Sequence, residues 1–154
     1  MKLFFKSENV AFELKPHPEN YLPQIAALDQ SLMDYAWSDK LWHNELLNSF
    51  SYLALIPEKG FLLFENNPNE DTLHLLKIAV SENERGTGIA KYLFEEFLEL
   101  ITQERGFRPK VYLEVECKNS RAIAFYTKLG FKKLHVKKKY YSDGKDALSM
   151  IFEH

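Results

Sequence analysis

The stretch LHLLKIAVSENERGTGIAKYLF, residues 73–94, passes from an apolar run through a glycine-rich turn into a helical pattern. The apolar run at 73–80 predicts a long, buried strand. The residues from about Gly86 to Glu104 predict a helix, because their apolar residues fall on one stripe, formed by Ile89, Leu93, Phe97 and Ile101. A strand that enters a helix in this way predicts an α/β fold, with a ligand expected beyond the carboxyl end of the strand.

Two glycines, Gly86 and Gly88, stand at the predicted start of this helix. Because they lack a β-carbon, a ligand can approach the backbone closely, and the free N–H groups of the first turn bind phosphate oxygens. A diphosphate fits such a site. The P-loop pattern G-x-x-x-x-G-K-[ST] is absent, and a dinucleotide fingerprint would need a third glycine where Lys91 stands. On its own, Gly86 is also compatible with a simple turn.

A second segment, LEVECKNSRAIAFYTKLGF at residues 113–131, carries groups suited to proton transfer. A predicted strand at 111–116 holds Glu114, and a predicted helix from Ser120 to Leu129 holds Tyr126; both side chains can exchange protons with a substrate. Gly130 is expected to end this helix as a C-terminal cap.

The rest of the chain extends the alternation of strands and helices outward, without a repeat, a low-complexity tract or a linker. The predicted order is β-α-α-β-β-β-α-β-α-β-β. Ser38 is an expected helix N-cap. The remaining expected elements are an extended segment at 3–14 with a turn near residues 7–9, helices at about 18–32 and after Ser38, a hairpin of 51–56 and 60–64, and strands at 131–141 and 147–152.

Composition predicts one packed domain over residues 1–154. The length, with 45% hydrophobic and 27% charged residues, is that of an ordinary globular domain. The first residues lack an apolar run long enough for a signal peptide, and no stretch approaches the ~20 apolar residues that cross a bilayer. The single cysteine, Cys117, excludes an internal disulfide and suits a reducing cytosol. We therefore expect a cytoplasmic protein with no membrane or nucleic-acid partner.

Charge is distributed unevenly around a formal net charge of −2. Residues 1–77 hold 6 Lys and Arg against 11 Asp and Glu, whereas residues 78–154 hold 14 against 11. A basic second half suits an anionic cofactor. We interpret most of the excess as a solvent-exposed strand edge, where lysine discourages pairing with other strands: Lys132, Lys133, Lys137, Lys138 and Lys139.

The two chemical segments together resemble the GNAT acetyltransferases. The run Arg85-Gly86-Thr87-Gly88-Ile89-Ala90 resembles their acetyl-CoA signature, which is Gln or Arg, two residues, Gly, one residue, and Gly or Ala. The next GNAT motif, N-x-x-A-x-x-x-Y-x-x-x-G-F, is matched by Asn119, Ala122, Tyr126, Gly130 and Phe131. The resemblance implies a mixed, mostly antiparallel central sheet with a splayed parallel strand pair and helices on both faces.

Within that superfamily, the chain is most similar to the bacterial ribosomal-protein-alanine N-acetyltransferases. The similarity is concentrated in Trp37-Ser38, the segment 113–131 and the tail 140–150. It departs at Ala36, where those enzymes usually have proline, and at a short hairpin followed by a polar loop at 65–72. It implies transfer of an acetyl group from acetyl-CoA to the N-terminal α-amine of a protein such as a ribosomal protein.

The resemblance also assigns roles to individual residues. Glu114 corresponds to the general base and Tyr126 to the general acid. The expected acceptor-contacting residues are Tyr35, Trp37, Glu116, Tyr140 and Tyr141. The expected cofactor-contacting residues are Ile78, Ala79, Val80, Arg85, Gly86, Thr87, Gly88, Ile89, Ala90, Lys91 and Asn119.

An α-amine demands less of a base than a lysine does. An α-amine has a pKa of ~7.7–8.0, so roughly a tenth of it is neutral near pH 7. A lysine has a pKa of ~10.4, so well under a thousandth of it is neutral at the same pH. Acetylation of a lysine or a small amine, and a catalytically silent acetyl-CoA-binding module, remain alternatives. A pure binder would need neither Glu114 nor Tyr126.

Simpler interpretations stand beside these roles. Glu114 could face solvent, with Glu116 on the same face sharing its task. Tyr126 could be a half-buried helix aromatic, and Trp37 and Tyr35 could be core residues. None of the histidines shows metal-ligand spacing, so no metal is expected: His17, His43, His74, His135 and His154.

Overall fold

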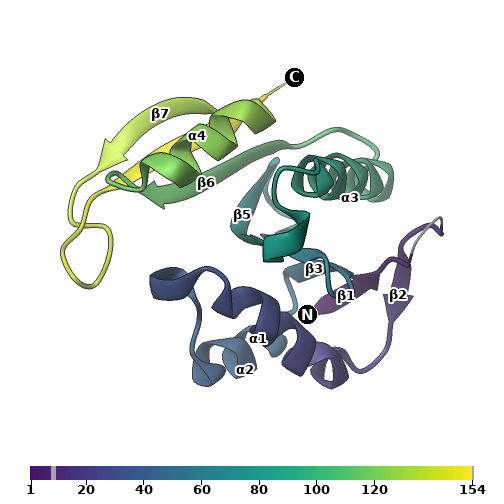
Figure 1. The fold of residues 1–154 in the computed structure, drawn as a ribbon. Helices are drawn as coiled ribbons and strands as arrows, with labels where there is room; N and C mark the ends of the chain where they lie inside the picture. The colour runs from purple at the N-terminus through teal and green to yellow at the C-terminus, as the bar shows by residue number, and fades with distance from the viewer. Residues whose placement is uncertain (8–9, 154) are drawn as a thin grey trace.

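A computed structural model describes residues 1–7 and 10–153. Among these residues, eight strands form one mixed sheet in the order β2-β1-β3-β4-β5-β6-β8-β7 (Figure 1). Most neighbouring strands are antiparallel; β1 with β3 and β5 with β6 are parallel. The strands are β1 (Lys2–Phe5), β2 (Glu13–Lys15), β3 (Ser51–Ile56), β4 (Gly60–Glu65), β5 (Thr72–Val80), β6 (Lys110–Glu116), β7 (Lys132–Lys137) and β8 (Ala147–Phe152).

Helices cover both faces of this sheet (Figure 1). Helices α1 (Leu22–Gln30) and α2 (Asp39–Leu46) pack on one face, where Ile25 and Trp42 join a buried cluster with β3 and β4. Helices α3 (Ile89–Arg105) and α4 (Ser120–Leu129) belong to the larger cluster on the opposite face. The expected α/β fold with a mostly antiparallel sheet is therefore confirmed.

The parallel strands β5 and β6 separate soon after they begin. They pair at only three positions, ending with His74 opposite Tyr112. On its other side, β5 pairs with β4, with Leu63 opposite Lys77 and Phe64 opposite Leu75. Leu76 is therefore the extra residue of a β-bulge, a feature that bends a strand and increases its twist. The bend carries β5 away from β6 toward the carboxyl ends, which confirms the splayed parallel pair.

Most predicted boundaries agree with the structure, and three are wrong. The strand expected at 131–141 is β7, which ends at Lys137, and residues 138 and 139 form a turn. The helix expected from Gly86 begins at Ile89, because Gly86 and Gly88 have φ of 79° and 89°, in the left-handed region that a right-handed helix excludes. The helix expected at 18–32 is a 3₁₀ turn, Pro18–Tyr21, followed by α1.

The predicted caps are confirmed. Ser38 caps α2 through its hydroxyl oxygen, which accepts the amide hydrogen of Leu41, and Gly130 ends α4 with a φ of 104°. The segment expected to be extended at 3–14 contains β1 and β2; part of its expected turn, residues 8 and 9, lies outside the described residues.

The lysine-rich segment includes an edge strand, as expected. β7 is the last strand of the sheet and pairs only with β8. Lys132 and Lys133 are exposed, whereas Lys137 is half-buried and turns toward β6. In the part of the chain that is described, no helix has the length and apolar content needed to cross a membrane.

Candidate active site

The turn between β5 and α3 presents free backbone amides at the opening between β5 and β6. Within the described residues, the N–H groups of Gly86, Gly88, Ala90 and Lys91 make no hydrogen bond. A β-carbon built on Gly86 or Gly88 meets nothing within 4 Å. Open space and unpaired donors at a helix start are what a diphosphate requires.

The edge of β5 that faces β6 is also free beyond the third paired position. Ile78, Ala79 and Val80 pair with Leu62, Phe61 and Gly60 of β4, while no described residue of β6 pairs with them. Their backbone groups on the open side can bind an extended ligand in the way that a neighbouring strand would. The region thus fits acetyl-CoA, with the diphosphate on the turn and the extended arm along β5.

The side chains expected to contact the cofactor have other partners. The Arg85 guanidinium donates to the carbonyl of Ser31 at 3.3 Å, and Lys91 lies 3.7 Å from Glu95. The Thr87 hydroxyl donates to the Glu84 carbonyl at 2.7 Å, and Asn119 Oδ1 accepts from the amide of Ala122 as the cap of α4. The site therefore offers mainly backbone donors, and cofactor contacts by these side chains remain predictions.

Glu114 lies on β6 two residues beyond Tyr112, the last residue that pairs with β5, and it pairs with Ser149 of β8 on its other side. Its Oε2 accepts from His74 Nε2 at 2.6 Å, and its Oε1 accepts from Lys137 Nζ at 2.5 Å. Burial acts to raise the pKa of this carboxyl, but the bonds from His74 and Lys137 outweigh burial and lower the pKa. Glu114 is thus a paired carboxylate, and the interpretation as a solvent-facing group is wrong, since 5% of its side chain is exposed.

The expected acceptor-contacting residues gather around Glu116, two positions further along β6. The Tyr35 hydroxyl donates to Glu116 Oε2 at 3.0 Å, and Lys145 Nζ lies 3.5 Å from the same oxygen. Tyr141 is half-buried; burial first, and then Tyr140, Glu114, Glu116 and Tyr35, raise its pKa to about 12. Tyr140 contacts the Tyr141 ring edge-on.

Tyr126 is on α4 and faces the sheet, where its ring packs against Phe125 and Phe131. Burial, with a smaller effect of Tyr141, raises the pKa of this phenol, so it stays protonated at neutral pH. It keeps a proton available for donation, and its role as general acid remains a prediction.

A buried network fixes the loop that brings Tyr35 over the sheet. Lys77 Nζ donates to Asp29 Oδ1 at 2.5 Å and to the carbonyl of Tyr35 at 2.7 Å. Asp29 Oδ2 also accepts from the amide of Trp37 and from Trp42 Nε1. The Trp37 ring packs on Trp42 with centroids 4.9 Å apart. Trp37 is half-buried and packs against the core, and its contact with an acceptor stays a prediction. Tyr35 is exposed, so its interpretation as a core residue is wrong.

Three of the groups that organise this site escaped the sequence analysis. The sequence marks His74 only as a histidine without metal-ligand spacing and Lys137 only as part of the lysine run, and it gives no sign of the Lys77–Asp29 pair. The alternation of β6 placed Glu114 and Glu116 on one face. Detecting the others requires the register between strands and helices far apart in the chain, and no local pattern supplies it.

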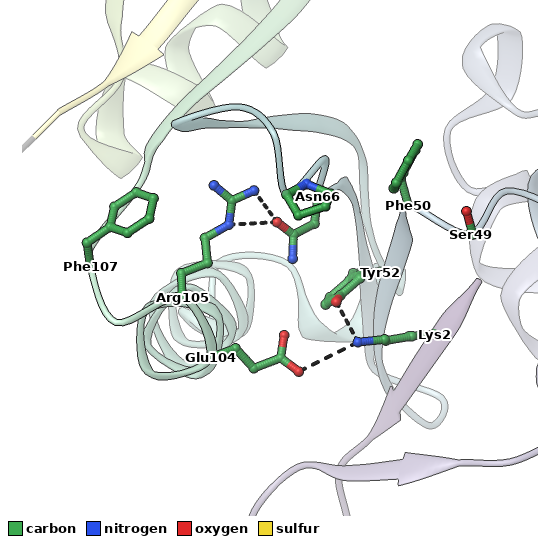
Figure 2. Close-up of a pocket in the computed structure, with 9 residues that line it drawn as sticks. Lys2, Ser49, Phe50, Tyr52, Asn66, Glu104, Arg105 and Phe107 are labelled. Carbon is green, nitrogen blue, oxygen red and sulfur yellow. Dashed lines mark hydrogen bonds and ion pairs between the residues drawn. The ribbon is translucent and has the colours of Figure 1, made fainter.

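A separate cavity lies at the other end of α3 from the glycine turn (Figure 2). It measures about 620 Å³ and is lined by Phe50, Phe107 and polar side chains that pair with one another. Lys2 Nζ bonds to the Tyr52 hydroxyl at 2.6 Å, and Arg105 is held by Asn66. Arg105 also holds the loop after β4, and no residue of the two chemical segments lines this cavity, so its size is no argument for catalysis there. No group of three or more potential metal ligands occurs among the described residues.

Comparison with known proteins agrees with this geometry. The model of the acetyltransferase (GNAT) family matches residues 13–131. An N-alpha-acetyltransferase of Saccharolobus solfataricus is 44% identical over 126 residues, which are 82% of this chain and 65% of that protein. The chain spans less than two thirds of the length of the first curated relatives that it matches.

Two solved structures share the fold. The ribosomal-protein-S18-alanine N-acetyltransferase from Escherichia coli superposes with a TM-score of 0.68 at 24% identity, covering 86% of this chain and 87% of that one. Naa50 of Arabidopsis thaliana, in complex with the bisubstrate analogue CoA-Ac-MVNAL, gives 0.68 at 23% identity, covering 94% and 100%. The family model covers most of the chain; the chain therefore belongs to the acetyltransferase (GNAT) family.

Proposed function

We propose that the chain transfers the acetyl group of acetyl-CoA to the N-terminal α-amine of a protein or peptide, with a ribosomal protein among the candidate acceptors. The observation that carries this proposal is the opening between β5 and β6. One side of it holds the free amides of the glycine turn, and the other holds the Glu114 carboxylate with its two partners. A donor and an acceptor can therefore meet at one place in the sheet.

Acetyl-CoA would bind with its diphosphate on the amides of residues 86–91 and its pantetheine arm along residues 75–80. Both stretches have unpaired backbone groups, and the path between them follows the direction of β5. Asn119 caps α4 with its side-chain oxygen, so its side-chain amide nitrogen takes no part in the cap and would contact the same arm. The thioester would then lie where the two strands part.

The acceptor would enter along the face formed by β6 and the two loops beside it. This face carries Glu114, Glu116 and the hydroxyls of Tyr35 and Tyr141, which suit a cationic amine and a peptide backbone. The Saccharolobus relative, named an N-alpha-acetyltransferase, supports the choice of an α-amine. Glu114, as the general base, would take a proton from the amine. Tyr126, as the general acid, would give a proton to the CoA thiolate.

Product mapping distinguishes an α-amine from a side chain. Peptides with varied first residues, each with one internal lysine, would be incubated with the protein and acetyl-CoA and sequenced by tandem mass spectrometry. The proposal predicts acetate on the α-amine of some peptides, and none on the same peptides with a succinylated N-terminus. Acetate on lysine alone would contradict it, and binding of acetyl-CoA without transfer to any amine would indicate the silent module.

We also propose that residues 1–154 act as one acetyltransferase domain and work in the cytoplasm. The buried clusters on the two faces of the sheet draw on elements from both ends of the chain, which supports a single unit. A single, cooperative unfolding transition with the same midpoint by circular dichroism and by tryptophan fluorescence is expected.

A further inference from the structure

The cavity at the end of α3 remote from the glycine turn has the size of a ligand site (Figure 2). Its volume of about 620 Å³ falls within the ~300–1,000 Å³ that small-molecule pockets occupy. None of the residues that line it belongs to the glycine turn, to β5 or to β6. A ligand bound here would therefore be separate from acetyl-CoA and from the acceptor.

Hydrogen-bond donors converge on the floor of this cavity. Lys2 Nζ donates to the Tyr52 hydroxyl oxygen at 2.6 Å, which leaves the hydroxyl hydrogen of Tyr52 for another acceptor. The side-chain oxygen of Asn66 accepts from Arg105, and Figure 2 shows its side-chain nitrogen turned toward Tyr52. Within residues 1–7 and 10–153, neither this nitrogen nor the Tyr52 hydrogen has an acceptor. Tyr52 and Asn66 are 8% and 6% exposed, so packing fixes both donors in place.

Lys2 adds a positive charge to these donors. The carboxylate nearest to it, on Glu104, lies 3.8 Å away, and the two side chains are 46% and 40% exposed. An exposed ion pair of this kind contributes little to stability, so a carboxylate of a ligand can take the place of Glu104 beside Lys2. An ammonium together with an amide and a hydroxyl donor is a set of partners that suits a carboxylate.

Arg105 gives the cavity a second positive charge. It donates to the side-chain oxygen of Asn66 and to the backbone carbonyls of Asn67 and Glu70, which are all neutral groups. The carboxylates of Glu70 and Asp71 act on Arg105 from beyond ion-pair distance. Glu104 is the only acidic residue among the described residues that line the cavity. The charge of the lining therefore favours an anion.

Two aromatic rings flank the polar floor. Phe50 and Phe107 are 38% and 46% exposed, and Figure 2 shows them on different sides of the polar groups. The Arg105 guanidinium lies 5.7 Å from the centroid of the Phe107 ring, and Pro68 adds a further apolar contact. A ligand with an aromatic ring would cover part of this apolar surface, because aromatic rings bury a large area and pack well against one another.

We propose that this cavity binds an aromatic carboxylic acid, whose carboxylate contacts Lys2, Tyr52 and Asn66. The aromatic ring of the acid lies on the apolar wall formed by Phe50, Pro68 and Phe107. The same chemical group occurs in small aromatic acids and at the C-terminus of a peptide that ends in an aromatic residue. The site does not depend on which amine the protein acetylates.

A matched pair of small probes tests the site directly. 3-Phenylpropanoate and 3-phenylpropanamide share the ring, and only the first has a carboxylate. In an NMR titration with saturating CoA, the acid should bind saturably and at least about tenfold more tightly than the amide. Its chemical-shift changes should centre on residues 49–52, 66–68 and 104–107. The absence of saturable binding, equal affinity for the amide, or shifts centred on residues 86–91 or 114–116 would overturn the proposal.

Two variants should change the affinity in opposite directions. Lys2→Met removes the ammonium and should weaken binding of the acid about tenfold, whereas Glu104→Gln removes the opposing carboxylate and should tighten it. Tyr52→Phe keeps the buried ring and should also weaken binding. Lys128→Met, at an exposed position in the last turn of α4, is the control and should bind as the wild type does.

Circular dichroism would establish that each variant is folded before its affinity is measured. Unchanged affinity in folded Lys2→Met and Glu104→Gln would overturn the proposal, because binding would then depend on the aromatic wall alone. A change of the same size in Lys128→Met would overturn it as well, since the net charge of the protein would explain the effect.

A peptide with a blocked N-terminus and a C-terminal phenylalanine distinguishes the two sources of the ligand. Binding at least about tenfold tighter than that of 3-phenylpropanoate, and lost on amidation of the C-terminus, would assign the cavity to a chain terminus. Equal or weaker binding would assign it to small aromatic acids. Both results support a carboxylate site, and tight binding that survives amidation would contradict it.

Discussion

Gly88 combines a left-handed backbone with an open space above it, at the residue where α3 begins. Its φ is 89°, and a β-carbon there would meet nothing within 4 Å. The protein itself therefore leaves room for a side chain, and the space is available to a ligand. Gly106 ends the same helix with a φ of 74° and equally open surroundings. Gly88 and Gly106 therefore have similar backbone conformations and similarly open surroundings, and they differ in lying at opposite ends of α3.

This pair gives a controlled prediction for the cofactor site. Gly88→Ala should lower the affinity for acetyl-CoA about tenfold, equivalent to ~1.4 kcal/mol, because the methyl group enters the space of the phosphates. Both Gly88→Ala and Gly106→Ala should lower the free energy of unfolding by ~1 kcal/mol, from the left-handed backbone. Calorimetry that finds equal affinity in the two variants would contradict the placement of the diphosphate.

Glu114 should leave a signature in the pH dependence of stability. Its pKa is lowered from 4.5 in the folded protein, so its contribution is present above that value and is lost as pH falls through the folded pKa. Urea unfolding should show Glu114→Gln to be less stable than the wild type at pH 7, with a difference that shrinks below about pH 4. Glu99→Gln, at an exposed pair with Arg108, should show a small difference at every pH. A constant deficit for Glu114→Gln would mean that its charge is not what stabilises the fold.

At this scale, the sequence predicted the residue types of the site better than their partners. Glu114, Tyr126 and the two glycines stand in motifs that can be recognised from spacing. The partners of Glu114 cannot, because His74 lies 40 residues and Lys137 23 residues away along the chain. Their meeting depends on strand register, which is a property of the folded sheet.

The element that shapes the acceptor side is the loop between α1 and α2. Lys77 of β5 holds it by a bond to Asp29 of α1 and another to the backbone of Tyr35, and the side chains of Lys77 and Asp29 are 5% and 0% exposed. Burial lowers the pKa of Lys77, while Asp29 acts to raise it. The network is satisfied at each carboxylate oxygen, so it holds the loop in one conformation.

Breaking this network should affect the acceptor more than the cofactor. Lys77→Met leaves the Asp29 charge buried without its cation and should cost ~3–5 kcal/mol in the free energy of unfolding. In the protein that remains folded, the loop loses its anchor, and KM for the peptide should rise while the Kd for acetyl-CoA stays the same. Lys6→Met is the control, since Lys6 is also buried but pairs with Glu96 on the opposite side of the fold. Equal changes in peptide KM for both variants would contradict a role for the loop.

The elements themselves were largely predictable, because local patterns determine them. Ser38 and Gly130 marked helix ends correctly through their capping chemistry. The sequence predicts the start of α3 three residues too early, because an apolar stripe does not reveal that Gly86 and Gly88 adopt left-handed conformations. The bulge at Leu76 was not anticipated, since a single extra residue in an apolar run changes no visible pattern.

At the scale of the whole molecule, the sheet has two parts joined at a narrow seam. Strands β1 to β5 carry the glycine turn, and strands β6 to β8 carry Glu114 and Glu116; three residue pairs connect them. Because the two strands diverge, the opening between them lies between the glycine turn and the carboxylates of β6. This arrangement explains why the cofactor motif and the proton-transfer groups, far apart in the chain, can act on one thioester.

The most direct test of this account is a crystal structure of the protein with CoA and an acceptor peptide. We expect the diphosphate on the amides of residues 86–91, the pantetheine arm along residues 75–80, and the peptide α-amine within hydrogen-bonding distance of His74 or Glu114. CoA bound elsewhere, such as the cavity lined by Lys2, Tyr52 and Arg105, or a peptide amine remote from β6, would contradict it.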